Sequence, residues 1–330
     1  MNVIDMHCDT IYRLYNDWRE GKEYRLRENK GHVDLLRMRK GNYCLQNFAL
    51  YIDLEAAENP FECGMEMLDL FYREMEANKD LIGIVKKYKD IEENRQKGRM
   101  SALLAIEEGE ACRGSLPFLH NFYRLGVRMM TLTWNYENSL AYPNAVKHHS
   151  DGTRETVADT KFGLKEAGIA FIQEMEKIGM IVDISHLNDA GIWDVFRYTK
   201  KPFVASHSNA RSIASHPRNL TDEMIKALAE RGGVAGINYC STFLRDWNGE
   251  KEHSQVSDMV DHMKHMKQIG GISCIGLGSD YDGIDGALQM RSPADISLLA
   301  DEMKKNGFTE NEIDAVFYEN VMRLYKDLLK

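Results

Sequence analysis

Short apolar segments of the kind that form buried strands recur along the chain, separated by longer segments in which apolar residues repeat at helical spacing. The predicted strands cover residues 3–9, 43–53, 101–107, 128–135, 180–186, 203–207, 233–240 and 274–280. The predicted helices cover residues 61–78, 159–178, 188–199, 221–231, 256–270 and 292–306. Thr221 stands where a helix would begin, and the glycine pairs 232–233 and 270–271 stand where helices would end.

Strands that alternate with helices indicate βαβ units and a parallel sheet. About eight such units in one chain are typical of a (β/α)8 barrel of the TIM type. A doubly wound sheet is the alternative, but it favours a glycine-rich turn after the first strand, and here that strand ends in His7, Cys8 and Asp9. Because there is no repeat and no Pro/Gly/Ser-rich linker, we expect a single domain over residues 1–330.

Composition and charge narrow the possible partners. The net charge of −9 argues against nucleic acid and anionic membranes as partners. No apolar run is long enough to span a bilayer, and the first residues lack the features of a signal peptide. The six cysteines contain no CxxC pair, which argues against a zinc ribbon or a redox motif. We therefore expect a cytoplasmic protein that keeps its thiols reduced.

Polar residues with metal-binding chemistry fall at the ends of the predicted strands. His7 and Asp9 are two positions apart, so they share one face of their strand. The other strand-end residues of this kind are Glu107, His186, His207, Asp280 and Asp282. Strand ends on the carboxyl side form the catalytic face of a parallel barrel, so these side chains should converge there.

A metal centre is the physical reason that we infer for this convergence. One histidine at a strand end is more commonly a hydrogen-bonded core residue, but several histidines and carboxylates on one face would be costly to bury without a cation. Histidine and carboxylate together suit zinc, and the set is large enough for two ions that share a carboxylate and a water. The other histidines are expected on the surface: His32, His120, His148, His149, His253, His262 and His265.

Five short motifs are spread along the chain: Asp-Met-His-Cys-Asp-Thr at 5–10, Ile-Glu-Glu-Gly-Glu-Ala at 106–111, His-Pro-Arg-Asn at 216–219, Gly-Ser-Asp-Tyr-Asp-Gly at 278–283 and Asn-Val-Met-Arg-Leu at 320–324. In these motifs the chain resembles a known family, the membrane (renal-type) dipeptidases of peptidase family M19, and in particular their soluble bacterial members. The spacing from His186 to His207 and on to Arg218 also fits the family pattern. These segments occur in the family's order and span essentially the whole chain.

The resemblance implies a metallo-dipeptidase that acts on small dipeptides and forms a homodimer. It implies two Zn²⁺ ions per chain, one held by His7 and Asp9, the other by His186 and His207, with Glu107 bridging them. It implies that Asp280 lies beside the attacking water and that Arg218 receives the substrate carboxylate. We also expect Asp282 and Trp134 among the substrate-binding residues. In the expected mechanism, a hydroxide shared by the ions attacks the carbonyl and Asp280 passes its proton to the leaving amine.

Two positions depart from the family pattern. Glu108 replaces a glycine and competes with Glu107 as the bridging carboxylate, but Glu107 directly follows the apolar strand and keeps Gly109 in register. Trp134 stands where mammalian-type members carry a histidine that is associated with substrate binding. Trp134 is either plain packing or a wall of the substrate pocket.

Two other functions remain open from the residues themselves. The alternative enzyme is another binuclear barrel amidohydrolase that cleaves a lactone, an amide or a phosphotriester, although such enzymes usually open with His-x-His and often bridge their metals with a modified lysine. The other alternative is a binding protein on a degenerate barrel, but such a protein should have lost ligands, and every expected position is filled here. Acceptance of a C-terminal D-residue is consistent with the resemblance.

Overall fold

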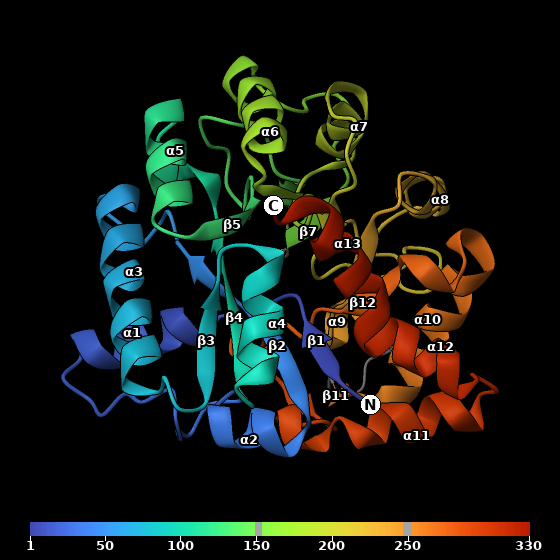
Figure 1. The fold of residues 1–330 in the computed structure, drawn as a ribbon. Coiled ribbons are helices and arrows are strands. Elements are labelled where there is room, and N and C mark those ends of the chain that lie inside the picture. The colour runs from blue at the N-terminus through green and yellow to red at the C-terminus, as the bar shows by residue number, and fades with distance from the viewer. Residues whose placement is uncertain (149–153, 247–252) are drawn as a thin grey trace.

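The computed structural model describes residues 1–148, 154–246 and 253–330 and shows a closed parallel barrel surrounded by helices (Figure 1). Each barrel strand pairs with the next one along the chain, and the last pairs with the first. The strands are β1 (Val3–Asp5), β2 (Tyr43–Tyr51), β4 (Met100–Glu107), β5 (Val127–Thr131), β8 (Ile181–Asp183), β9 (Val204–Ala205), β10 (Val234–Ile237) and β12 (Ile275–Leu277). The expected (β/α)8 barrel is confirmed, and each predicted strand segment overlaps one of these strands.

Helices cover the outside of the barrel in the order expected for βα units (Figure 1). They are α1 (Thr10–Arg19), α2 (Leu35–Lys40), α3 (Pro60–Ala77), α4 (Tyr88–Gln96), α5 (Leu116–Arg124), α6 (Glu166–Ile178), α7 (Asp189–Tyr198), α8 (Asp222–Glu230), α9 (Ser241–Leu244), α10 (Val256–Gly270), α11 (Ser297–Lys305), α12 (Glu310–Asp314) and α13 (Asn320–Leu328). The side chain of Thr221 accepts a hydrogen bond of 3.3 Å from the backbone N–H of Met224 and caps α8 as predicted. The helix predicted from residue 159 begins only at Glu166, because Asp159 closes a turn with the N–H of Lys161 at 2.8 Å.

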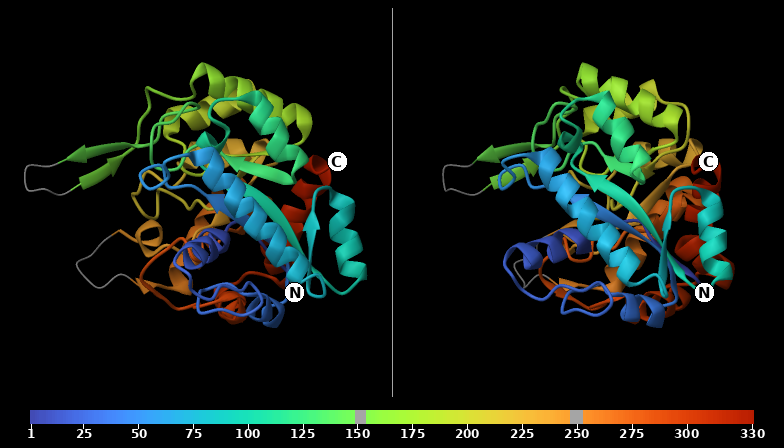
Figure 2. Two further views of the ribbon diagram at one scale, coloured as in Figure 1. Left: turned by 90° about the vertical axis from the view of Figure 1, so that its left-hand side faces the viewer. Right: turned by 60° about the vertical axis from the view of Figure 1, so that its left-hand side comes forward.

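Five further strands escaped the sequence prediction. The strand β3 (Ile82–Val85) pairs with the first half of β4, while β5 pairs with the second half of the same edge, so β3 lies outside the closed ring. The strands β6 (Ala145–His148) and β7 (Arg154–Val157) form an antiparallel hairpin that projects from the barrel (Figure 2). The short strands β11 (His253–Ser254) and β13 (Ala287–Leu288) pair with each other.

The barrel interior is closed at one end by the last helix. Apolar side chains that point inward from the strands, such as Ile4, Leu45 and Met129, pack with residues of α13 in one buried cluster. The hydroxyl of Tyr325 in α13 donates a hydrogen bond of 2.9 Å to the side chain of Asn47 inside the barrel. The opposite end, where the strands finish, is therefore the end that remains available for a site.

Within the described ranges, no helix is both long enough and apolar enough to cross a lipid bilayer.

Candidate metal centre and active site

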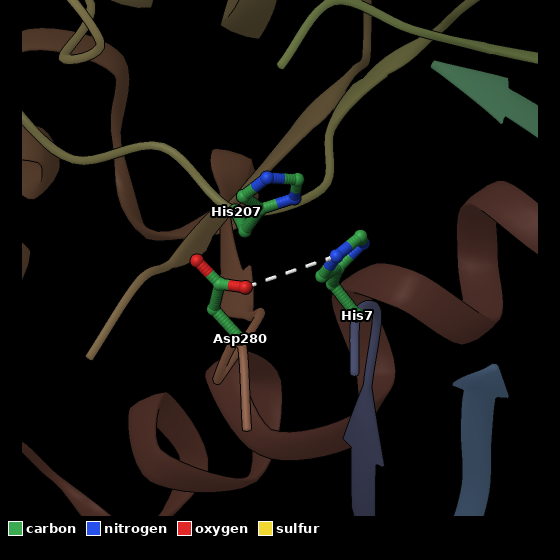
Figure 3. A group of neighbouring side chains, drawn as sticks. All are labelled: His7, His207 and Asp280. Carbon is green, nitrogen blue, oxygen red and sulfur yellow. Dashed lines mark ion pairs between the residues drawn. The ribbon is translucent and has the colours of Figure 1, made fainter. Parts of the chain in front are cut away.

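The strand ends carry a tight group of histidines and carboxylates. Glu107 is the last residue of β4, and each of His7, His186, His207 and Asp280 follows a barrel strand within three residues. Figure 3 shows His7, His207 and Asp280 pointing toward one another from three different parts of the chain. All five residues are more than nine-tenths buried, so any charge among them is sheltered from solvent.

One half of the group gathers around one oxygen of Glu107. Its Oε1 atom lies 3.0 Å from Nε2 of His186 and 3.4 Å from Nε2 of His207. The two Nε2 atoms are themselves 2.9 Å apart. Ligand atoms of Glu107, His186 and His207 all lie within 4.8 Å of one another, a spacing that one metal ion can occupy.

The other half gathers around His7. Its Nε2 atom lies 3.3 Å from Oε2 of Glu107, 3.4 Å from Oδ2 of Asp9 and 3.9 Å from Oδ1 of Asp280. Ligand atoms of His7, Asp9 and Glu107 form a second compact trio, and those of His7, His207 and Asp280 form a third. Glu107 thus faces both halves, one oxygen to each.

The buried charges at this group favour a cation. Burial raises the pKa of Asp9 well above its usual value, and the adjacent Glu107 carboxylate raises it further. Burial lowers the pKa of His7, but the carboxylates of Glu107 and Asp9 outweigh it, so the net shift is well upward. Burial lowers the pKa of His186 to about 3, which leaves it neutral near pH 7. The two carboxylates therefore attract positive charge beside a neutral imidazole, which is the environment of a metal ligand set.

Unsatisfied atoms and donor chemistry both fit divalent metal. Nε2 of His7 and Oδ1 of Asp9 are buried and have no hydrogen-bond partner among the described residues. Nitrogen and carboxylate oxygen donors together suit zinc or a similar ion. Two trios that share Glu107 are more donors than one tetrahedral ion needs.

Neighbouring residues hold the histidines in place, and the sequence analysis did not identify them. Asp183 accepts hydrogen bonds from the N–H groups of Ser185 and Ser206, at 3.0 and 2.9 Å. The hydroxyl of Ser206 bonds both Asp183 and Nδ1 of His207, the latter at 2.7 Å. Asn135 Oδ1 lies 3.1 Å from Nδ1 of His186. Such partners fix which ring nitrogen is free to bind a metal. Asp183 could have been identified from the sequence, because it is an acid inside the apolar segment 180–186.

The structure separates Glu107 from Glu108. Glu107 points to the histidines, whereas Glu108 turns away with a φ of 94° and accepts a hydrogen bond of 2.8 Å from the backbone N–H of Trp134. Burial raises the pKa of Glu108 to about 7. Of the two glutamates, only Glu107 is placed within reach of the histidines.

Backbone strain is concentrated at these strand ends. Residues other than glycine with positive φ include His186 at 68°, Asp280 at 62° and Asp282 at 66°. Such conformations cost about 1–3 kcal/mol each and persist where the surroundings enforce them. The strain aims His186 and Asp280 into the group and explains why the predicted strands there are longer than the observed ones.

The expected substrate residues lie beside the group. Arg218 is buried; its guanidinium donates at 3.3 Å to the Ser208 hydroxyl and to the His207 carbonyl, and its Nε has no hydrogen-bond partner among the described residues. Trp134 lines a cleft of about 470 Å³ together with Glu107 and His186. Arg218 lines a neighbouring hollow of about 220 Å³.

Asp282 is among the residues that line the larger cleft, as the expected substrate contact requires, although its carboxylate is bonded within the protein. Its side chain is 0% exposed and accepts hydrogen bonds of 2.7 Å from the hydroxyl of Thr10 and from the N–H of His32. Its oxygens also accept from the N–H of Val33 and pair with Arg13, each at 3.3 Å. These bonds occupy both oxygens and tie the segment before α2 to the end of β12.

The prediction that His262 lies at the surface is wrong. His262 is fully buried on α10, where Nδ1 accepts from the N–H of Ala210 and Nε2 lies 3.0 Å from the Leu244 carbonyl. His149 lies outside the described residues.

Comparisons with known proteins agree with this geometry. The family described as membrane dipeptidase, peptidase family M19, matches residues 1–329. An uncharacterised dipeptidase of Schizosaccharomyces pombe is 30% identical over 343 residues, covering 98% of this chain and 80% of the relative.

Two solved structures of metallopeptidases have the same fold as this chain. A metallopeptidase from Rhodobacter sphaeroides, bound to a phosphinate mimic of the dipeptide L-Ala-D-Ala, has a TM-score of 0.89 at 25% identity and covers 100% of this chain and 99% of its own. The M19 metallopeptidase called dipeptidase AC has a TM-score of 0.88 at 26% identity, with coverages of 100% and 99%. The likeness therefore includes all the strand ends that carry the group.

Proposed function

Because the chain belongs to the membrane dipeptidase family, peptidase family M19, and is a metal-dependent dipeptidase, we propose that it holds two zinc ions and has the activity classified as EC 3.4.13.19. The observation that carries the proposal is that the two oxygens of Glu107 face His186 and His7 separately, at 3.0 and 3.3 Å. A carboxylate so placed can serve two ions at once.

The ligand assignment follows from the two halves of the group. His7 and Asp9 would hold one ion, His186 and His207 the other, and Glu107 would belong to both. When bound, the ions supply Lewis acidity, which polarises a peptide carbonyl and makes a water molecule acidic near neutral pH.

Asp280 would move the proton. Its Oδ2 accepts a hydrogen bond of 2.9 Å from the side-chain amide of Asn238, which leaves Oδ1 directed toward His7. It also lines the cleft, so the same oxygen can take a proton from the attacking water and give it to the leaving amine.

Arg218 would select short substrates. Its guanidinium is buried beside His186 with an unsatisfied Nε, so a carboxylate arriving there would gain charge-assisted hydrogen bonds. A contact between Arg218 and the free carboxylate would favour short peptides, since it would require the C-terminus to lie close to the scissile bond. Trp134 and Asp282 would both line the cleft beside the substrate, and the carboxylate of Asp282 would also hold the backbone at His32.

We extend the proposal to organisation and location. The chain would act as a single domain over residues 1–330 and as a homodimer in the cytoplasm. The resemblance to the family supports the dimer, and the absence of any disulfide among its six cysteines supports a reducing compartment. The relative bound to a mimic of L-Ala-D-Ala supports acceptance of a C-terminal D-residue.

A hydrolysis panel tests the function directly. Purified protein, chelated protein and chelated protein given zinc back are each incubated with L-Ala-L-Ala, L-Ala-D-Ala, a tripeptide, a lactone and a phosphotriester. The proposal predicts dipeptide cleavage that disappears on chelation and returns with zinc, with little cleavage of the tripeptide. Turnover of the lactone or phosphotriester without dipeptide cleavage would favour the other amidohydrolase activities instead.

A further inference from the structure

Three aromatic side chains form one wall of the main cleft. The rings of Tyr12, on α1, and Tyr51, at the end of β2, meet edge to face with centroids 4.8 Å apart. Tyr51 in turn meets Trp134 edge to face at 5.0 Å. All three residues line the cleft of about 470 Å³ that also contains Glu107. We refer to Tyr12, Tyr51 and Trp134 as the aromatic wall.

A buried carboxylate fixes the last member of this wall. Glu108 is 0% exposed, and its Oε2 accepts from the backbone N–H of Trp134 at 2.8 Å. Its Oε1 accepts from the N–H of Glu110 at 2.9 Å and from the side-chain amide of Asn138. All three partners are donors, so a carboxylate satisfies them and an amide of the same shape cannot. The two departures from the family pattern, Glu108 and Trp134, are therefore in direct contact.

The two hollows indicate which end of a dipeptide meets the aromatic wall. The smaller hollow contains Arg218, and it shares Asn135, His186 and Phe243 with the main cleft. The main cleft is lined by the carboxylates Asp280 and Asp285 in addition to the wall. A carboxylate end is attracted to the hollow with the guanidinium, and an ammonium end is attracted to the cleft with the acids. The residue on the amino side of the scissile bond then lies against the wall.

We propose that the aromatic wall binds the side chain of the N-terminal residue of the dipeptide. Glu108 is the positioning residue that holds Trp134 in the wall. The enzyme consequently prefers dipeptides with a large apolar N-terminal side chain. This inference rests on the dipeptidase function proposed above. The faces and edges of aromatic rings give a flat apolar side chain both buried area and favourable ring contacts. An alanine side chain reaches little of this surface, so discrimination of about ten- to a hundredfold is expected.

The experiment compares substrates that differ at one position. kcat/KM is measured for Phe-Ala, Lys-Ala, Ala-Ala and Ala-Phe with the wild type, Trp134→Ala and Glu108→Gln. Trp193→Ala and Glu110→Gln are the matched controls, since Trp193 is 41% exposed on α7 and Glu110 accepts from the N–H of Ser139, which a glutamine oxygen can still do.

The wild type should cleave Phe-Ala at least about tenfold better than Ala-Ala. Trp134→Ala should reduce that ratio about tenfold, and Glu108→Gln should reduce it about three- to tenfold, with bound metal retained in both. The ratio of Ala-Phe to Ala-Ala should not move, and both controls should behave as the wild type. A ratio unchanged in Trp134→Ala, an effect on Ala-Phe instead, or a preference for Lys-Ala over Phe-Ala would each overturn the inference while leaving dipeptidase activity intact. Failure of the wild type to cleave any dipeptide would overturn the proposed function itself.

Discussion

The side-chain amide of Asn238 donates a hydrogen bond of 2.9 Å to Oδ2 of Asp280. The other oxygen of Asp280, Oδ1, lies 3.9 Å from Nε2 of His7, one of the proposed metal ligands. Asn238, which directly follows β10, therefore orients the carboxylate that would transfer the proton.

Replacement of Asp280 by asparagine tests that role. If Asp280 moves the proton, Asp280→Asn should keep most of the metal and lower kcat by about 10²–10⁴-fold. Metal content and steady-state kinetics of the same preparation provide the measurement. Loss of one ion together with activity would make Asp280 chiefly a ligand, and an unchanged kcat would exclude it as the proton carrier.

Arg218 should distinguish acids from amides. Arg218→Lys keeps the charge but loses the planar fork, so kcat/KM for a dipeptide should fall about ten- to a hundredfold. The corresponding dipeptide amide should be a poor substrate of the wild type and should be little affected by the change. If the wild type cleaves the amide as well as the acid, Arg218 does not bind the carboxylate.

Asp282 should matter for stability more than for substrate binding. Its buried carboxylate accepts from Thr10, His32 and Val33, and Asp282→Asn would place an amide donor against these donors. We expect the free energy of unfolding to fall by about 1–3 kcal/mol. Urea unfolding measures the loss, with Asp301→Asn on the exposed side of α11 as the control. A large rise in KM with unchanged stability would instead show that the Asp282 carboxylate contacts the substrate.

His262 should make stability depend on pH. Burial lowers the pKa of His262 from 6.5 to about 4, so the folded state favours the neutral ring. As the pH falls, the unfolded chain therefore takes up a proton at a higher pH than the folded chain does. The stabilisation is complete above about pH 6.5 and is lost as the pH falls from 6.5 toward 4, by about 3 kcal/mol in total. The difference in unfolding free energy between wild type and His262→Gln should therefore shrink between pH 7.5 and pH 5. A constant difference across that range would contradict the assignment.

One physical pattern predicted both the barrel and the convergence of the polar residues at its strand ends. Buried parallel strands are continuous apolar segments, and their carboxyl ends must meet, so polar residues placed there identify the site face. The strand β3 was missed because Ile82–Val85 is short and pairs with only half of β4. The hairpin β6–β7 was missed because the sequences Ala-Val-Lys-His and Arg-Glu-Thr-Val lack the continuous apolar pattern of a core strand.

Other misses arose where a side chain's partner is distant in the sequence. Nothing near Asp282 indicates that His32 and Val33 fold over it. His262, by contrast, was detectable, because it lies between Met259 and Met266 on the buried face of α10. The positive φ at Glu108 and His186 could not be predicted, since strain of this kind is imposed by the surrounding fold.

The most direct test of a two-metal centre bridged by Glu107 is the metal content of three proteins: the wild type, Glu107→Gln and Glu108→Gln. Glu107 faces both halves of the group and Glu108 faces neither. We therefore expect about two zinc ions per wild-type chain, loss of metal and activity together in Glu107→Gln, and two ions retained in Glu108→Gln. Elemental analysis alongside dipeptide turnover gives the answer. Full activity of a wild-type chain without metal, or metal loss in Glu108→Gln rather than Glu107→Gln, would contradict it.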